Sequence, residues 1–269
     1  MTGPIAAPGS IHRTTPLLSV RDLSLRFGGI HALREVCFDV PTGSICGLIG
    51  PNGAGKTSLF NCLSRLYEPS SGEIEFRGER ITSVAPHRVA QLGIGRTFQN
   101  LALFRSLSVL DNIRIGRHCR SRGGFVANAL RLPFVRDERA QTQRQAHALI
   151  EFLQLESVVN ERVSDLPFGT QKRVELGRAL AGEPTLLLLD EPACGLNHEE
   201  VGRLGELIRH VRDTLKITVL LVEHHMGLVM SISDHLIALN FGRVLAQGAP
   251  QTVAGDPAVV AAYLGGEAA

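Results

Sequence analysis

The sequence predicts an α/β fold with a parallel sheet, a separate antiparallel sheet and an inserted group of helices. Three runs, 45–49, 186–189 and 217–222, are apolar almost throughout, which is typical of parallel strands covered by helices on both faces. Apolar residues recur at helical spacing after these runs. Alternation of apolar and polar residues in 17–45 and around 74–76 indicates antiparallel strands with one solvated face.

Each element has its own local signal. Residues 1–16 are rich in Pro, Gly and Thr and are expected to form a flexible tail. Two predicted strands follow, in which apolar residues alternate with polar ones, and Gly28-Gly29 offers a turn between them. The apolar positions are Leu23, Leu25 and Phe27 in the first strand, and Val36, Phe38 and Val40 in the second. Ile74 and Phe76 alternate between Gly72 and Gly78. Two apolar helix faces are expected, formed by Leu59, Phe60, Leu63, Leu66 and by Val201, Leu204, Ile208, Val211, Leu215.

Residues 96–165 show no strand pattern and are predicted to form a helical subdomain, with Ala146, Leu149, Ile150 and Leu153 on one helix face. Residues 17–95 and 166–269 would then form the core, with the antiparallel unit and a C-terminal segment. The stretch 112–144 contains eight arginines, whereas Asp137 and Glu138 are the acidic residues set against them in the charge balance. It is either a solvated face or a surface for anionic lipid or an acidic partner.

Composition excludes several classes of protein. A net charge of +2 over 269 residues gives no basis for binding nucleic acid. Five dispersed cysteines without a CxxC pair argue against a disulfide framework and structural zinc. The longest apolar runs are far shorter than the roughly 20 residues that a membrane-spanning helix needs. Any membrane association is therefore expected to go through a partner.

Residues 50–57 match the pattern GxxxxGK[ST] directly after an apolar strand and before a helix. In that context the loop backbone surrounds phosphate oxygens and the helix N-terminus adds partial positive charge. Lys56 would reach the β- and γ-phosphates, and the Thr57 hydroxyl would bind Mg²⁺. The alternative is an ordinary glycine-rich turn. The residues expected to bind nucleotide are Gly50, Pro51, Asn52, Gly53, Ala54, Gly55, Lys56, Thr57 and Ser58.

Two further strand ends carry polar residues. Asp190 and Glu191 follow four leucines, so they are expected beside the phosphate loop, where Asp190 can hold Mg²⁺ and Glu191 can polarise water. His224 and His225 follow another apolar run. Adjacent strand residues face opposite ways, so the two are not expected to share a metal. One of them is placed to face the γ-phosphate, unless it only caps a strand.

Gln99 and residues 166–175 have weaker signals. Gln99 stands where the insert begins and could contact Mg²⁺ or water, with a surface glutamine as the alternative. Residues 166–175 read as a short turn leading into a helix, with Gly169 near its start. That is a second phosphate-binding helix end or simply the start of a helix.

Together these segments resemble the ABC-transporter ATPase family from Leu17 to Gly266. The resemblance implies that 50–57 is Walker A, 186–191 is Walker B and 194–197 is the D-loop. It further implies that Gln99 and His224 act in catalysis with Glu191, that Mg²⁺ is held by Thr57, Gln99 and Asp190, and that Phe27 stacks on adenine. The signature segment is 166–171, in which Phe168, Gly169, Thr170 and Gln171 would act on a partner subunit's ATP.

The resemblance is nearest to the branched-chain amino-acid transporter ATPases, through residues 95–100, 191–197, 222–224 and 256–265. The chain departs from the common pattern at three positions. Pro167 replaces the signature serine, Asn197 the D-loop acid and His225 a common aspartate. Which side chain takes the place of the serine is left open by the sequence.

The family implies a RecA-like P-loop core, ATP and Mg²⁺ as cofactors, and a homo- or heterodimer of ATPases that sandwiches two ATP molecules. It also implies permease subunits, an external substrate-binding protein and a place at the cytoplasmic face of the plasma membrane. Leu101, Leu103 and Phe104 either pack in the core or line a groove for a permease helix. Related urea, amide or lipopolysaccharide systems, and ABC ATPases outside transport, are the alternatives.

Overall fold

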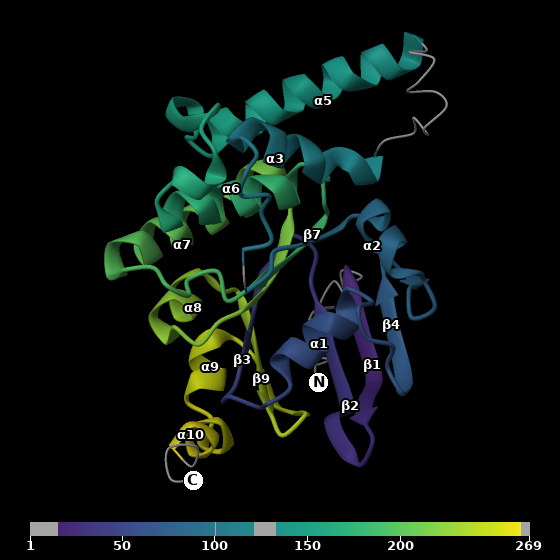
Figure 1. The fold of residues 1–269 in the computed structure, drawn as a ribbon. Helices are drawn as coiled ribbons and strands as arrows, with labels where there is room; N and C mark the ends of the chain where they lie inside the picture. Colours follow the sequence, from purple (N-terminus) through teal and green to yellow (C-terminus); the bar gives the residue numbers. More distant parts are fainter. Residues whose placement is uncertain (1–15, 100, 121–132, 265–269) are drawn as a thin grey trace, which may run out of the picture.

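The computed structural model describes residues 16–99, 101–120 and 133–264. Its strands form two sheets, with helices between and around them (Figure 1). The larger sheet has six strands in the order β10-β9-β3-β8-β7-β6, and the smaller has four in the order β2-β1-β4-β5. The predicted α/β class, with a mainly parallel and a separate antiparallel sheet, is confirmed.

The small sheet is antiparallel throughout and contains both predicted alternating regions. Its strands are β1 (Leu18–Phe27), β2 (Ile30–Val40), β4 (Ser71–Phe76) and β5 (Glu79–Arg80). The predicted turn between β1 and β2 contains Gly28, whose φ of 56° lies in the left-handed region that favours glycine. Phe27, the last residue of β1, is 48% exposed.

The large sheet is built around the three predicted apolar runs. They are β3 (Ile45–Ile49), β8 (Thr218–Val222) and β7 (Leu186–Asp190), which are parallel neighbours with every residue buried. Three strands were not predicted: β9 (His235–Asn240), β10 (Arg243–Gly248) and β6 (Ile94–Arg96). Strand β6 pairs with β7 and places Arg96 in the sheet, where the sequence had suggested the start of the helical insert.

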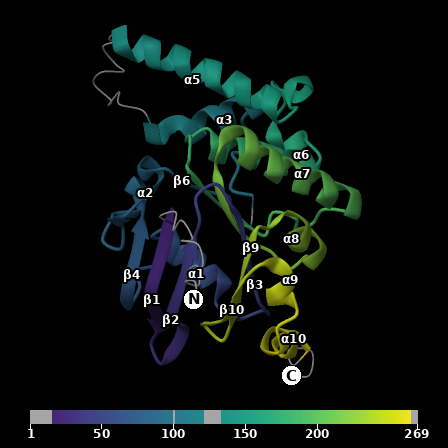
Figure 2. The same cartoon turned by 180° about the vertical axis from the view of Figure 1, so that it is seen from behind.

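Helices cover both faces of the large sheet (Figures 1 and 2). One face packs with α1 and the small sheet, and the other with α3, α5, α6, α7 and α8. The helices are α1 (Lys56–Leu63), α2 (Pro86–Leu92), α3 (Val109–Gly116), α5 (Pro133–Phe152), α6 (Phe168–Leu180), α7 (His198–Leu215), α8 (Met226–Ile232), α9 (Pro250–Ala254) and α10 (Pro257–Leu264). Short 3₁₀ helices are η1 (Arg117–Arg120), η2 (Glu156–Val158) and η3 (Val163–Asp165).

Some sequence predictions need correction or fall outside the described residues. Helix α1 ends at Leu63, and Leu66 is 53% exposed, so its predicted place on the apolar helix face was wrong. The chain cannot continue as a helix because Arg65 has a left-handed φ of 59°. The tail predicted for residues 1–16 lies outside the described residues except Pro16, and so does part of the arginine-rich stretch.

Candidate functional site

The phosphate loop joins β3 to α1 and is shaped by two glycines. Gly50 has a φ of 151°, and a Cβ there would lie 2.1 Å from the Leu239 carbonyl oxygen. Gly55 has a φ of 105°, and a Cβ there would lie 2.7 Å from the Ala32 oxygen. At both positions the backbone lies too close to a neighbouring carbonyl group for a side chain to fit. The loop can therefore pack directly against β9 and β2.

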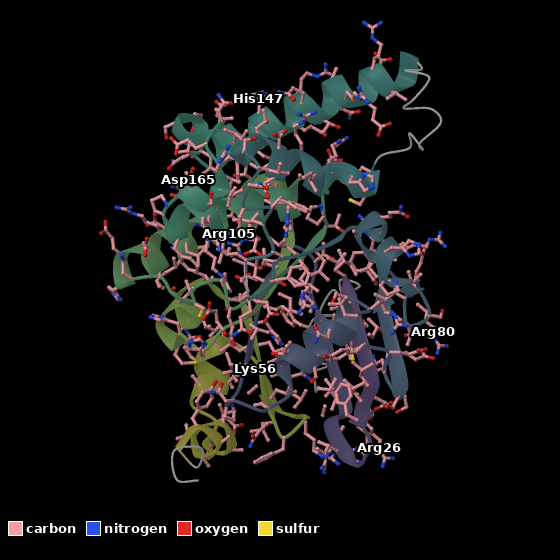
Figure 3. All side chains as sticks on the ribbon, in the orientation of Figure 1. Arg26, Lys56, Arg80, Arg105, His147 and Asp165 are labelled. Carbon is pink, nitrogen blue, oxygen red and sulfur yellow. The ribbon has the colours of Figure 1, made fainter. Side chains whose placement is uncertain are left out.

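The Lys56 side chain is folded back onto this loop. Its Nζ donates to the carbonyl oxygens of Gly50 at 2.7 Å and Pro51 at 3.0 Å. The residue is only 7% exposed, and its burial lowers the pKa of the ammonium. The charges of Glu191 and Asp190 act in the opposite direction and raise this pKa. Figure 3 labels Lys56, the first residue of α1. The ammonium is thus held at the loop by neutral acceptors.

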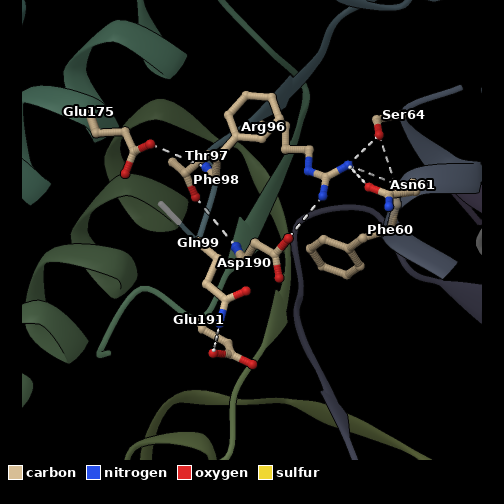
Figure 4. Close-up of polar contacts among 10 residues, drawn as sticks. All are labelled: Phe60, Asn61, Ser64, Arg96, Thr97, Phe98, Gln99, Glu175, Asp190 and Glu191. Atoms are coloured by element: carbon tan, nitrogen blue, oxygen red, sulfur yellow. Dashed lines mark hydrogen bonds and ion pairs between the residues drawn. The ribbon is translucent and has the colours of Figure 1, made fainter. Parts of the chain in front are cut away.

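Gln99 and Glu191 are brought together from distant parts of the sequence (Figure 4). Gln99 Nε2 donates to Glu191 Oε2 at 2.9 Å. Glu191 directly follows β7, has a φ of 47°, and donates its backbone N–H to the Val222 oxygen of β8. This hydrogen bond fixes the turn at the carboxyl end of the sheet, where ligands of α/β folds bind.

Arg96 is a site residue that sequence reasoning missed. Its Nη2 lies 2.9 Å from Asp190 Oδ2, and the two side chains are 8% and 5% exposed. Its Nη1 donates to Asn61 Oδ1 at 2.8 Å and to Ser64 Oγ at 2.6 Å (Figure 4). Arg96 therefore connects the end of β7 with the C-terminal part of α1.

Glu223 is a second missed residue. It is fully buried, and its Oε1 accepts from the Ala193 N–H at 2.6 Å. Its Oε2 accepts from the backbone N–H groups of His224 at 3.2 Å and His225 at 3.4 Å. One carboxylate thus ties the loop after Glu191 to the loop after β8.

The two histidines do not lie on a strand, because β8 ends at Val222, so the alternation argument applied to them was wrong. His225 Nδ1 accepts from the Leu228 N–H at 3.2 Å and caps α8. His224 is exposed. Among the described residues, no group of three or more His, Cys, Asp or Glu side chains could hold a metal ion.

The segment 166–171 is the start of α6, which begins at Phe168 after Pro167. Phe168 is 43% exposed, with the Lys172 ammonium 5.5 Å from its ring centre. Two of the predicted contact side chains also have partners in the chain itself. Gln171 Nε2 donates to the Leu166 oxygen at 2.8 Å, and Thr170 Oγ1 accepts from Arg173 at 3.3 Å.

Gly169 packs against the start of α7. A Cβ at Gly169 would lie 2.8 Å from Glu200 Oε1. Glu200 is held in a capping box, in which its Oε2 accepts from the Asn197 N–H at 2.9 Å and its own N–H donates to Asn197 Oδ1 at 3.0 Å. The side chain of Asn197 is therefore a helix cap.

Comparison with known proteins identifies the family. A model described as ABC transporter matches residues 33–194, more than half of the chain. The chain belongs to the ABC transporter family. The cassette is accordingly an ATPase subunit of a transporter. A second model, described as branched-chain amino acid ATP-binding cassette transporter, matches its residues 243–269.

The cassette is similar to transport proteins over nearly its whole length. It is 41% identical over 251 residues to the high-affinity branched-chain amino acid transport ATP-binding protein BraF of Pseudomonas aeruginosa, covering 93% of this chain and 98% of BraF. It is 40% identical over 250 residues to LivG of Escherichia coli, with the same coverage. A solved ADP conformation of an ATP-binding cassette superposes with a TM-score of 0.82 at 28% identity, covering 94% and 100% of the two chains.

Proposed function

We propose that this cassette is the ATPase of an importer for branched-chain amino acids. The match of residues 243–269 carries the proposal, because this segment lies outside the ATP-binding motifs and its model is named for that substrate. The similarity to BraF and LivG, whose names give the same substrate, supports it.

ATP would bind with its phosphates in the loop at residues 50–58 and its base against the half-exposed ring of Phe27. Lys56 would exchange its two carbonyl acceptors for phosphate oxygens, which bind an ammonium more strongly than a neutral carbonyl does. The Phe27 ring contacts Tyr67 edge-to-face, with ring centres 5.3 Å apart. That contact restrains the Phe27 ring, which supports a stacking role against the base.

The residues present suit Mg²⁺. Thr57, Gln99 and Asp190 would offer hydroxyl, amide and carboxylate oxygens, which are the hard ligands that Mg²⁺ prefers. The ion pair with Arg96 uses Asp190 Oδ2, and Oδ1 takes no part in it. When bound, the ion would neutralise charge on the β- and γ-phosphates.

Glu191 would orient and polarise the attacking water, with His224 facing the γ-phosphate. The hydrogen bond from Gln99 Nε2 uses Glu191 Oε2 and leaves Oε1 available to accept from the attacking water. Glu223 would keep His224 in reach, because it accepts the backbone N–H at 3.2 Å. Through its hydrogen bond, Gln99 would orient the carboxylate of the base.

A second cassette, identical or homologous, would complete each site. Phe168, Gly169, Thr170 and Gln171 would face the partner subunit's ATP from the start of α6. With Pro167 in place of serine, the free backbone N–H groups of this helix end, and its partial positive charge, would supply the contact.

The permease would dock between the core and the helices of 96–165. A cavity of about 350 Å³ lies there, and Leu66, Phe98 and Ile115 in its lining are 53%, 37% and 38% exposed. Among the described residues no helix is both long enough and apolar enough to cross a membrane. From the similarity to the transport ATP-binding proteins BraF and LivG, we place the cassette at the cytoplasmic face of the membrane, bound to permease subunits that work with an external substrate-binding protein.

Transport in cells tests the proposal. Deletion of the coding sequence should abolish uptake of labelled leucine, isoleucine and valine, and the parent chain should restore it. Glu191→Gln keeps the side-chain shape but cannot accept a proton, so it should be expressed and fail to restore uptake. Restoration of urea, amide or lipopolysaccharide transport instead would overturn the substrate assignment while leaving the ATPase assignment intact.

A further inference from the structure

Glu175 is a buried carboxylate that none of the roles above uses. It lies on α6 and is 2% exposed. Burial raises the pKa of its carboxyl group, whereas the positive charges of Lys172 and Arg178 act to lower it. A buried carboxylate is costly unless hydrogen bonds compensate its lost hydration. Here the partners are not side chains of its own helix but backbone groups of another segment.

Those partners lie on both sides of Gln99. Glu175 Oε1 accepts from the N–H of Phe98 at 3.2 Å and from the N–H of Ala102 at 3.4 Å. Just before them, the Thr97 N–H donates to the Leu188 oxygen of β7 at 3.0 Å. The segment that carries Gln99 is thus bound to the large sheet through Thr97, whose Oγ1 also accepts from the Asp190 N–H, and to α6 through Glu175 Oε1 and Arg178, which donates to the Ala102 oxygen. Figure 4 shows the contact between Glu175 and Phe98.

Helix α6 connects this oxygen to the segment that would face the partner's ATP. Residues 168–175 span about 10 Å along the helix axis at 1.5 Å per residue. Because a helix moves as a rigid unit, a shift of its first turn displaces the Glu175 carboxylate by a similar amount. The carboxylate would then pull on the backbone around Gln99, which donates to Glu191.

We infer that Glu175 is a positioning residue that makes Gln99 move with the N-terminal turn of α6. The inference rests on the proposed function, in which Gln99 serves the cassette's own ATP and the start of α6 serves the partner's. Through Glu175, docking of α6 onto the partner's nucleotide would move Gln99 relative to Glu191. Hydrolysis in one site would thereby depend on occupancy of the other.

Two substitutions separate hydrogen bonding from charge. Glu175→Leu removes the acceptor and leaves two backbone N–H groups without a partner, whereas Glu175→Gln keeps an oxygen at the same place. In the full-length nucleotide-free chain, amide exchange in peptides containing Phe98 and Ala102 should be about ten-fold faster for Glu175→Leu and unchanged for Glu175→Gln. If Glu175→Leu does not fold, Glu175→Asp withdraws the carboxylate by one methylene and should show the same acceleration.

Turnover and binding provide the second readout. In the transporter assembled with its permease, Glu175→Leu should lower kcat about ten-fold while ATP affinity of the isolated subunit stays within about two-fold, and Glu175→Gln should restore kcat. Unchanged amide exchange, equal losses in affinity and kcat, or an equally impaired Glu175→Gln variant would each overturn the inference. A parent complex that does not hydrolyse ATP would instead refute the proposed function, and amide exchange alone would then decide whether Glu175 positions the segment.

Discussion

The Arg96 guanidinium lies 2.9 Å from the Asp190 carboxylate, and both side chains are almost completely buried. This ion pair joins β6 and β7 at the edge where nucleotide is proposed to bind. Arg96 Nε is buried without a hydrogen-bond partner among the described residues. The cation is held by the pair and by hydrogen bonds to Asn61 Oδ1, Ser64 Oγ and the Phe60 carbonyl oxygen.

Removing Arg96 should destabilise the fold strongly. Arg96→Met leaves the buried Asp190 carboxylate unpaired, which costs about 3–5 kcal/mol in the free energy of unfolding. Arg80→Met is a matched control, because Arg80 pairs with Glu73 at the same 2.9 Å distance but both side chains are about half exposed. Arg80 lies on β5, the edge strand of the small sheet, and is labelled in Figure 3. The control should cost at most about 1 kcal/mol. Urea unfolding of the nucleotide-free chain measures both, and equal losses would contradict the prediction.

Lys56→Ala should separate nucleotide binding from folding. The ammonium is held at the loop by two carbonyl groups, and its loss should weaken ATP binding about 100-fold or more, because a buried charge–phosphate contact disappears. Titration with a fluorescent ATP analogue measures the affinity, with circular dichroism to verify the fold. Lys216→Gly removes a lysine charge at the left-handed C-cap of α7 and should leave affinity unchanged. ATP binding by Lys56→Ala at the parent's affinity would show that the loop does not bind phosphate.

Gly169 is constrained by its packing against Glu200 and, in the proposed dimer, by the partner's γ-phosphate. A double substitution separates these two constraints. Gly169→Asp places a carboxylate beside Glu200 and, in the proposed dimer, beside the partner's γ-phosphate. Glu200→Gln removes the first charge repulsion but leaves the close contact of the new Cβ, so the double variant should regain the part of the stability that Gly169→Asp loses to charge. Hydrolysis by the dimer should remain abolished, because the second repulsion persists. Recovery of hydrolysis together with stability would mean that the segment acts only through packing on α7.

The parts of the fold that the sequence predicted are those with local signals. The phosphate loop was predictable because a strand, a glycine pattern and a helix follow one another directly. Strand β6 has three residues, one of them Gly95, which is too short for a periodic pattern to show. Arg96 and Glu175 were missed because their partners lie 94 and 77 residues away in the chain, and nothing local indicates that they are buried.

For the apolar residues 101–104, too, the local sequence did not decide which side chains are buried. Core packing and a docking groove were both consistent with their sequence. In the structure Leu103 packs partly against the core, whereas Phe104 is 50% exposed, so core burial is wrong for Phe104. The cavity between the core and the helices of 96–165 is lined by other residues, including Leu66, Phe98 and Ile115. The groove predicted from Leu101, Leu103 and Phe104 stays a prediction, and the cavity is a second candidate for the docking surface.

Three aspartate substitutions locate the permease surface. Leu66→Asp and Ile115→Asp place a charge in the lining of the cavity, where an apolar permease helix would have to desolvate it, so both should abolish co-purification with the permease and uptake of branched-chain amino acids. Phe104→Asp is the matched control, since its side chain is as exposed as that of Leu66 but lies outside the cavity lining. All three should fold and bind ATP like the parent, because each change replaces an exposed side chain. Loss of co-purification in Phe104→Asp alone would return the docking surface to residues 101–104 and refute the assignment of the cavity.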